Sequence, residues 1–134
     1  ELGAKLIVET LSSIGTGAVK SVPQSRQGVT YASKLQGRER RIDWRMTSTG
    51  IDRQVRAFAV KPGAWFEYGS DRIKVLKSKP IKGSGAPGIV LEGMDIACGE
   101  GVLQVETVQP SGKKPMDAAD FLNGYDLPPG TVLP

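Results

Sequence analysis

The sequence of 134 residues predicts a mainly β fold, a small antiparallel β-barrel with two short helices, preceded by a separate helix and a linker. Three observations support this prediction. The first 14 residues carry helical periodicity, the next stretch is polar and aperiodic, and the second half consists of short β-prone runs between glycine-containing turns. A chain of this length can form one domain with its own core and a short appendage.

The N-terminal segment is predicted to be an amphipathic helix over residues 1–14. Leucine and other apolar residues recur there near helical spacing, and Gly15 ends the pattern. Residues 18–28 contain Ser, Pro and Gln without periodicity, which is typical of a linker. Because the chain starts without Met, we expect a truncated piece in which the helix is the end of a preceding domain.

A second helix is predicted over residues 48–58, where Ile51, Val55 and Phe58 form one apolar face. Thr47 or the residue after it can cap the first turn, and a Pro-Gly pair stops the helix a few residues beyond its end.

Short β-prone runs follow this helix. Their close spacing, with one intervening helical element, fits a small antiparallel barrel, of which the OB type is a nucleic-acid-binding example. A last short helix is predicted over residues 117–123, with Asp117 suited to capping and Gly124 at its end. The five candidate strands cover residues 64–68, 72–78, 88–91, 95–98 and 102–109.

The residue counts argue against several classes of chemistry. The chain has no His and one cysteine, Cys98, so a zinc site, a Ser or Cys catalytic triad and an internal disulfide are not expected. We predict no metal site and no catalytic residue, with Cys98 a buried, unreactive thiol. No apolar run approaches the roughly 20 residues of a membrane span and no secretory pattern opens the chain, so we expect a cytoplasmic protein without membrane contact.

Basic charge is concentrated in one part of the chain. The net charge is +4, but residues 20–82 hold 15 Lys or Arg against 5 Asp or Glu. Such a block favours a polyanion-binding face, because neutralising phosphates releases counterions. The alternative is a basic surface that is only solvated. The candidate nucleic-acid-binding residues are Lys20, Arg38, Arg40, Arg41, Arg45, Lys74, Lys77, Lys79, Lys113 and Lys114.

Other motif-like features carry little functional weight. Residues 83–88 match the dinucleotide pattern G-x-G-x-x-G, but a strand and not a helix is expected after them. Asp117 and Asp120 could share a helix face as an acid and base pair, yet carboxylates at a helix N-terminus more often satisfy backbone N–H groups. Trp44 and Trp65 could stack on bases, but such isolated aromatic residues more often belong to the core.

Several short fragments occur in an order and spacing that are specific when taken together. They cover nearly the whole chain, which resembles the C-terminal domain of the methionyl-tRNA formyltransferase family. GKKPM at 112–116, followed by FLNG at 121–124, favours this family over its relatives. The other fragments are VTYASKL at 29–35, Glu39, IDW at 42–44, IDRQVRAF at 51–58, PGAW at 62–65, Pro87–Gly88 and QPS at 109–111.

The resemblance implies a function for a longer parent enzyme. It implies transfer of a formyl group from 10-formyltetrahydrofolate to the amino group of methionyl initiator tRNA in translation initiation. Folate binding and catalysis would belong to an N-terminal formyltransferase domain, whose tail helix would be residues 1–17, followed by the linker at 18–28. Residues 29–134 would form an OB-like tRNA-binding domain that is inactive alone.

Within the stretch GRERRIDWR, residues 37–45, the resemblance assigns structural roles to Asp43 and Trp44. Trp44 is expected to be buried and Asp43 to be hydrogen-bonded or to cap nearby. Lys20 matches a basic position of the family's linker, whereas the arginines of the stretch are phosphate candidates on charge alone. A guanidinium suits this role because it can bind a phosphate with two parallel hydrogen bonds.

Two alternatives remain open at this point. The chain could belong to a related formyltransferase or formyl hydrolase that acts on a small molecule or a nucleotide sugar, in which case RNA affinity would be weak or absent. It could also be a free-standing module that binds protein or oligosaccharide, with a basic block that is merely solvated.

Overall fold

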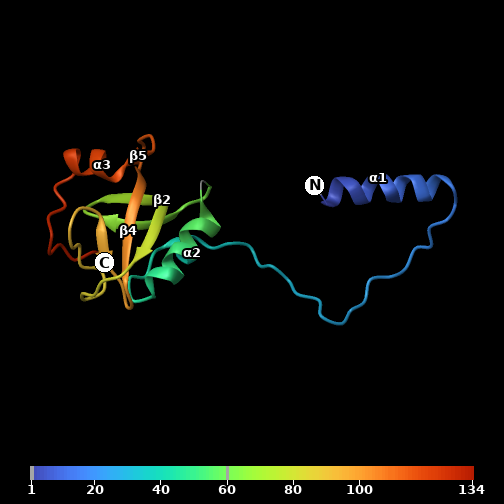
Figure 1. Cartoon of the computed structure of the whole chain (residues 1–134), viewed down its shortest axis with the longest axis horizontal. Coiled ribbons are helices and arrows are strands. Elements are labelled where there is room, and N and C mark those ends of the chain that lie inside the picture. The colour runs from blue at the N-terminus through green and yellow to red at the C-terminus, as the bar shows by residue number, and fades with distance from the viewer. Residues whose placement is uncertain (1, 60) are drawn as a thin grey trace. The chain divides into compact units, whose positions relative to one another are not determined.

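A computed structural model gives the structure of the chain and describes residues 2–59 and 61–134. The chain divides into two compact units, residues 1–34 and 35–134 (Figure 1). In the first unit, helix α1 (Leu2–Gly15) confirms the predicted helix, although its predicted start at Glu1 lies outside the described residues. No residue of α1 is buried. Residues 18–34 form neither helix nor strand.

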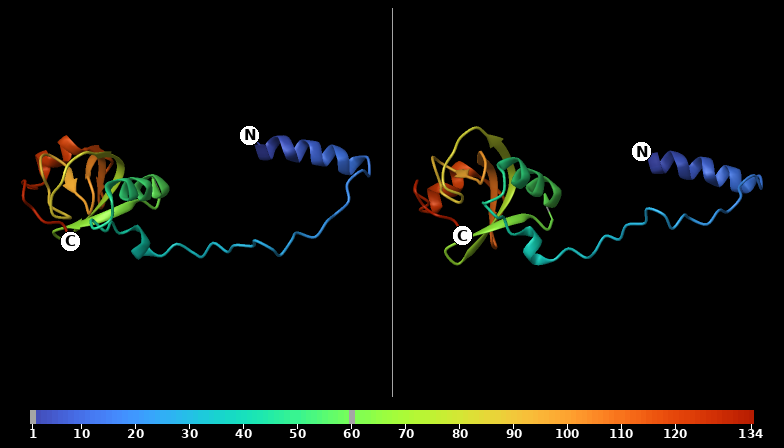
Figure 2. Two further views of the ribbon diagram at one scale, coloured as in Figure 1. Left: turned by 60° about the horizontal axis from the view of Figure 1, so that its bottom comes forward. Right: turned by 90° about the horizontal axis from the view of Figure 1, so that it is seen from below.

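The second unit is built on one antiparallel sheet of five strands. The strand order is β1-β2-β4-β3, and β5 pairs with β4. The sheet twists around the core in the manner of a half-barrel, which confirms a small OB-like β domain (Figure 2). The strands are β1 (Ala64–Tyr68), β2 (Asp71–Ile81), β3 (Asp95–Ala97), β4 (Val102–Pro110) and β5 (Met116–Asp117).

Helix α2 (Ser48–Phe58) has the bounds that its apolar period and its capping residue predict. The Thr47 hydroxyl accepts a hydrogen bond from the Gly50 amide at 3.0 Å, which satisfies one of the free N–H groups of the first turn. Ile51 and Val55 are fully buried and pack the helix against β2 and β4.

Two shorter helices complete the unit. A 3-10 turn, η1 (Gly37–Arg40), precedes the buried residues of the arginine-rich stretch. Helix α3 (Ala118–Gly124) lies close to its predicted position. The expected capping role of Asp117 is wrong, because Asp117 occupies the N-cap position but its side chain makes no capping hydrogen bond.

The predicted strand at residues 88–91 is also wrong. The backbone partners of this segment are divided between β3 and the C-terminal segment, so no continuous ladder forms. Ile89 makes an isolated bridge with Val132, and Val90 makes one with Ile96. In addition, β5 was not predicted, since two residues are too few to show a period.

A β-bulge in β2 explains why Lys77 is exposed. Strict alternation would place Lys77 on the same face as Ile73 and Val75, both of which are fully buried. The register between β2 and β4 shifts on both sides of Lys77, so its side chain lies outside the core and is 71% exposed.

The core lies between the sheet and α2, and it includes Trp44, which is 3% exposed. The Trp44 ring meets Phe66 edge to face, with 5.7 Å between the ring centroids. Asp52 is the one buried carboxylate among the described residues; it accepts hydrogen bonds from Arg56 and from Ser78 on β2. Among the same residues, no helix could cross a membrane and no cluster of side chains could bind a metal ion.

Candidate nucleic-acid interface

The arginine-rich stretch becomes an extended edge of the barrel after η1. Arg41 forms a parallel bridge with Trp65 of β1, and the Ile42 amide donates to the Trp65 carbonyl at 2.8 Å. Because side chains of an extended segment alternate, Ile42 and Trp44 enter the core while Arg41, Asp43 and Arg45 lie on the outer side. The expected burial of Trp44 is confirmed.

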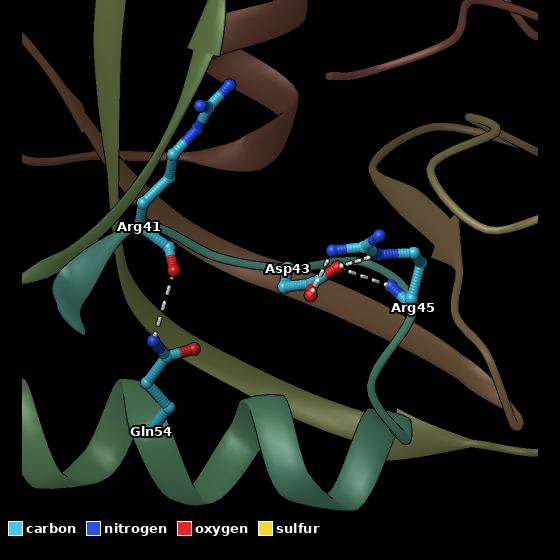
Figure 3. Close-up of polar contacts among 4 residues, drawn as sticks. All are labelled: Arg41, Asp43, Arg45 and Gln54. Carbon is cyan, nitrogen blue, oxygen red and sulfur yellow. Dashed lines mark hydrogen bonds and ion pairs between the residues drawn. The ribbon is translucent and has the colours of Figure 1, made fainter. Parts of the chain in front are cut away.

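The side chain of Gln54 fixes this segment to helix α2. Its Nε2 donates to the Glu39 carbonyl at 2.9 Å and to the Arg41 carbonyl at 3.2 Å, and Figure 3 shows the second of these bonds. One side chain of helix α2 therefore helps to fix the backbone that carries the arginines, together with the contacts to Trp65. Gln54 was not among the predicted site residues, although it belongs to the IDRQVRAF fragment.

Asp43 and Arg45 form a bidentate ion pair (Figure 3). Arg45 Nε donates to Asp43 Oδ1 and Nη2 donates to Oδ2, both at 2.8 Å, and the Arg45 amide adds a third bond to Oδ1 at 3.1 Å. The pKa of Asp43 is lowered to about 2, chiefly because the Arg45 side chain donates to its charged form. The expected hydrogen-bonded role of Asp43 is confirmed.

Arg41 belongs to a second cluster, which is centred on Trp65. Its Nη2 lies 3.3 Å from Glu67 Oε2, and the Nε of Arg72 lies 3.9 Å from the other oxygen of Glu67. The guanidinium of Arg72 lies 4.5 Å from the centroid of the Trp65 ring, and that of Arg41 lies 6.0 Å from it. We call these four residues the Trp65 cluster.

Two residues of the Trp65 cluster, Glu67 and Arg72, were not among the predicted site residues. Their positions across the β1–β2 turn, which pairs Glu67 with Arg72, are the signal that could have found them. Trp65 itself is 8% exposed. A ring this buried, with arginines against it, is better suited to orienting those arginines than to stacking on a base.

A cleft of about 430 Å³ lies beside the arginine-rich edge. Arg38, Arg41 and Arg45 line it together with Asp43, and Pro87 and the C-terminal residues also belong to the lining. We call it the Trp44 cleft. Its full lining is Arg38, Arg41, Ile42, Asp43, Trp44, Arg45, Pro87, Leu133 and Pro134.

Arg40 does not line this cleft. Its Nη1 donates to the Pro62 carbonyl at 3.4 Å, and the residue is partly buried. Arg38, in contrast, makes no side-chain hydrogen bond or ion pair within the residues that the structure describes, and it is exposed. The four arginines of the stretch therefore differ in how free they are to bind an anion.

None of the predicted lysines lines the Trp44 cleft. On β2, the stem of Lys74 covers Gly63, whose positive φ of 84° disfavours any residue with a side chain. Lys77 pairs with Glu106 at 2.7 Å, and Lys79 is exposed. Lys113 lies over the Tyr125 ring at 4.9 Å from its centroid. Lys20 belongs to the first unit and Lys114 to an exposed loop.

The remaining chemical candidates have structural roles. Cys98 is buried, its Sγ lies 3.4 Å from the Ile96 carbonyl, and burial raises the pKa of its thiol to about 11, which fits an unreactive cysteine. The glycine-rich run at 83–88 is a loop, and the isolated bridges of residues 89 and 90 follow it in place of a helix.

Comparison with known proteins identifies the class of this fold. The sequence matches the family described as formyl transferase, C-terminal domain, over residues 34–126, and the chain belongs to that family. Its similarity is to one kind of formyl transferase in particular. It is 48% identical to the methionyl-tRNA formyltransferase of Paracoccus denitrificans over 128 residues, and 46% identical to that of Paramagnetospirillum magneticum over 134.

These alignments cover 96% and 98% of this chain but 42% and 44% of the relatives, so the chain spans less than half of their length. A similar fold occurs in HypX from Aquifex aeolicus, whose structure in complex with tetrahydrofolic acid superposes with a TM-score of 0.69 at 23% identity. That superposition covers 88% of this chain and 22% of HypX.

Proposed function

We propose that this chain is the tRNA-binding C-terminal part of a methionyl-tRNA formyltransferase. The observation that carries the proposal is the similarity to curated methionyl-tRNA formyltransferases along nearly the whole chain. In this proposal the parent enzyme acts in the cytoplasm during translation initiation. It transfers a formyl group from 10-formyltetrahydrofolate to the amino group of methionyl initiator tRNA.

Folate binding and catalysis are assigned to a formyltransferase domain that precedes this chain. Helix α1 supports this division, because it exposes an apolar face that a solvated helix would not need. We propose that residues 1–17 pack against the catalytic domain and that residues 18–28 link it to the barrel at 29–134. The exposed apolar residues of α1 are Leu2, Leu6, Ile7, Val8, Leu11 and Ile14.

The barrel's role is to position the tRNA by its phosphates. Arg38, Arg41 and Arg45 share one cleft, which supports them as the centre of the interface. Phosphate contacts fix the orientation of a nucleic acid but carry little sequence information. Discrimination of the initiator tRNA therefore falls chiefly to the catalytic domain. The remaining proposed contacts are Lys20, Arg40, Lys74, Lys77, Lys79, Lys113 and Lys114.

A chimera tests the proposed activity. This chain replaces the matching C-terminal part of the Paracoccus denitrificans enzyme, and formylation of methionyl-tRNA is measured with 10-formyltetrahydrofolate as donor. We expect the chimera to formylate methionyl-tRNA and the isolated chain to have no activity. A folded chimera that formylates no better than the truncated enzyme would contradict the proposal. It would favour a relative that acts on a small molecule.

A further inference from the structure

We propose that the Trp44 cleft is a subsite for a single unpaired nucleotide, with the phosphate on the arginine side and the ribose or base against the apolar wall. This inference rests on the proposed RNA-binding function and deepens it. Phosphate positioning alone needs only exposed cations, whereas this open cleft brings arginines and apolar residues together in one lining.

The size of the cleft fits one nucleotide. Its volume of about 430 Å³ is in the lower part of the range for small-molecule sites, roughly 300 to 1,000 Å³. A duplex presents its phosphates on a convex surface and cannot insert into a pocket of this size. A nucleotide from a single strand, a loop or an unpaired end can, because its base is free of a pairing partner.

The arginines are oriented before any ligand arrives. Asp43 engages Nε and Nη2 of Arg45, which leaves the Nη1 donors of that guanidinium free, and Glu67 holds Arg41 through Nη2. Arg38 retains its whole donor set within the described part of the chain. With one carboxylate side chain against three guanidinium groups, the side chains of the lining keep a positive balance that suits a phosphate.

The rest of the lining offers apolar contact, and it includes Trp44, whose N–H has no acceptor among the described residues. Pro87 and Leu133 supply apolar surface, which suits the face of a base or a ribose. This N–H, on Nε1, is buried. The adjacent indole atom, Cδ1, lies beside Gly88, the residue that follows the lining residue Pro87. A buried N–H normally has a partner; this one is closed to solvent, so a ribose or base oxygen reaches it only if the indole or its neighbours shift.

The proposal is tested by following backbone and indole N–H resonances of the full chain by NMR. The probes are adenosine 5′-monophosphate, inorganic phosphate and adenosine. We expect the monophosphate to shift the resonances of residues 41–45, of Gly88 and of the Trp44 indole N–H, with inorganic phosphate producing smaller shifts. Equal shifts from inorganic phosphate would show that the cleft binds only an anion. The absence of shifts at these residues would exclude nucleotide binding in the cleft.

Two variants separate the cleft from general electrostatics. Arg38→Ala removes the unpaired guanidinium of the cleft, whereas Arg53→Ala removes an exposed arginine on α2 that does not line it. We expect Arg38→Ala to weaken binding of the monophosphate roughly tenfold, since a hydrogen-bonded charge contributes on that scale, and Arg53→Ala to leave it unchanged. Equal effects of the two variants would overturn the subsite.

RNA binding by the same proteins distinguishes this inference from the proposed function. An RNA hairpin with a single-stranded 3′ extension should bind more tightly than its blunt counterpart, and Arg38→Ala should reduce the difference. If both hairpins bind equally and the monophosphate does not reach the cleft, the subsite is wrong while RNA binding stands. If the monophosphate occupies the cleft but neither hairpin binds at low salt, the subsite is supported and the RNA function is wrong.

Discussion

The guanidinium of Arg45 donates two parallel hydrogen bonds of 2.8 Å to the carboxylate of Asp43, and both residues line the Trp44 cleft. The pair neutralises part of the charge of the arginine-rich stretch and at the same time fixes the direction of Arg45. The GRERRIDWR stretch therefore has two roles. Ile42 and Trp44 anchor it in the core, while its arginines differ in how many donors remain available to bind an anion.

The first prediction concerns the titration of Asp43. Its pKa should lie at about 2 in the folded chain, and Arg45→Ala should return it toward the ordinary value of about 3.9. Because the folded-state pKa is depressed, the stabilising contribution of the pair is present above the unfolded-state pKa. It is lost as the pH falls through the folded-state pKa, between about 4 and 2. Carbon NMR of the Asp43 carboxyl group measures this directly. An unshifted pKa in the wild-type chain would show that the pair does not persist in solution.

The second prediction separates two neighbouring arginines. Replacing Arg40 and Arg41 together by Ala should weaken RNA binding and flatten its dependence on salt, by roughly 0.7 to 0.9 log units of slope for each phosphate that is no longer neutralised. Arg41→Ala alone should account for most of this change, since Arg41 lines the cleft while Arg40 is bonded to the Pro62 carbonyl. RNA binding measured at several salt concentrations tests this prediction, with Arg53→Ala as the control. An unchanged slope in the double variant would remove both arginines from the interface.

The third prediction concerns Glu67, which opposes RNA binding in this account. Glu67→Gln removes a negative charge beside Arg41 and Arg72, while the amide oxygen of Gln can still accept a hydrogen bond from Arg41 and keep its orientation. We expect tighter RNA binding at low salt and a steeper salt dependence. Glu92→Gln is the matched control. It changes the net charge by the same amount as Glu67→Gln, at a residue outside both the Trp65 cluster and the Trp44 cleft. If the two variants bind RNA equally well, the effect of Glu67 is only that of net charge.

The fourth prediction tests the anchoring role of Gln54. Gln54→Leu should lower the free energy of unfolding by about 1 kcal/mol, because two hydrogen bonds to backbone carbonyls disappear while a buried side-chain oxygen without a partner is also removed. The amides of residues 39–42 should exchange faster with solvent, and RNA affinity should fall. Denaturation and hydrogen exchange measure the two effects. Unaltered exchange at these amides would show that the bridge to Trp65 fixes the segment without Gln54.

Local signals predicted most of the elements correctly. Helix α2 follows from the period of Ile51 and Val55 and from the Thr47 cap, all of which lie within a few residues of one another. The predicted strand at 88–91 failed because the isolated bridges of Ile89 and Val90 depend on segments that are remote in sequence. No local pattern records such pairing.

The basic character of the site could be predicted from the sequence, but the arrangement of its side chains could not. Burial of Trp44 and the hydrogen bonding of Asp43 were anticipated through the family resemblance. The approach of Arg41 to Glu67 was not, because it depends on how residues 41 and 42 dock along β1. The exposure of Lys77 likewise depends on a bulge that is defined only by the pairing of β2 with β4.

The affinity of this chain for initiator tRNA, measured as a function of salt with an elongator tRNA as comparator, tests the central claim most directly. We predict weak, steeply salt-dependent binding to both tRNAs, since phosphate contacts position the RNA without reading its sequence. No binding to either tRNA at low salt would contradict the account and would make the basic block a solvated surface.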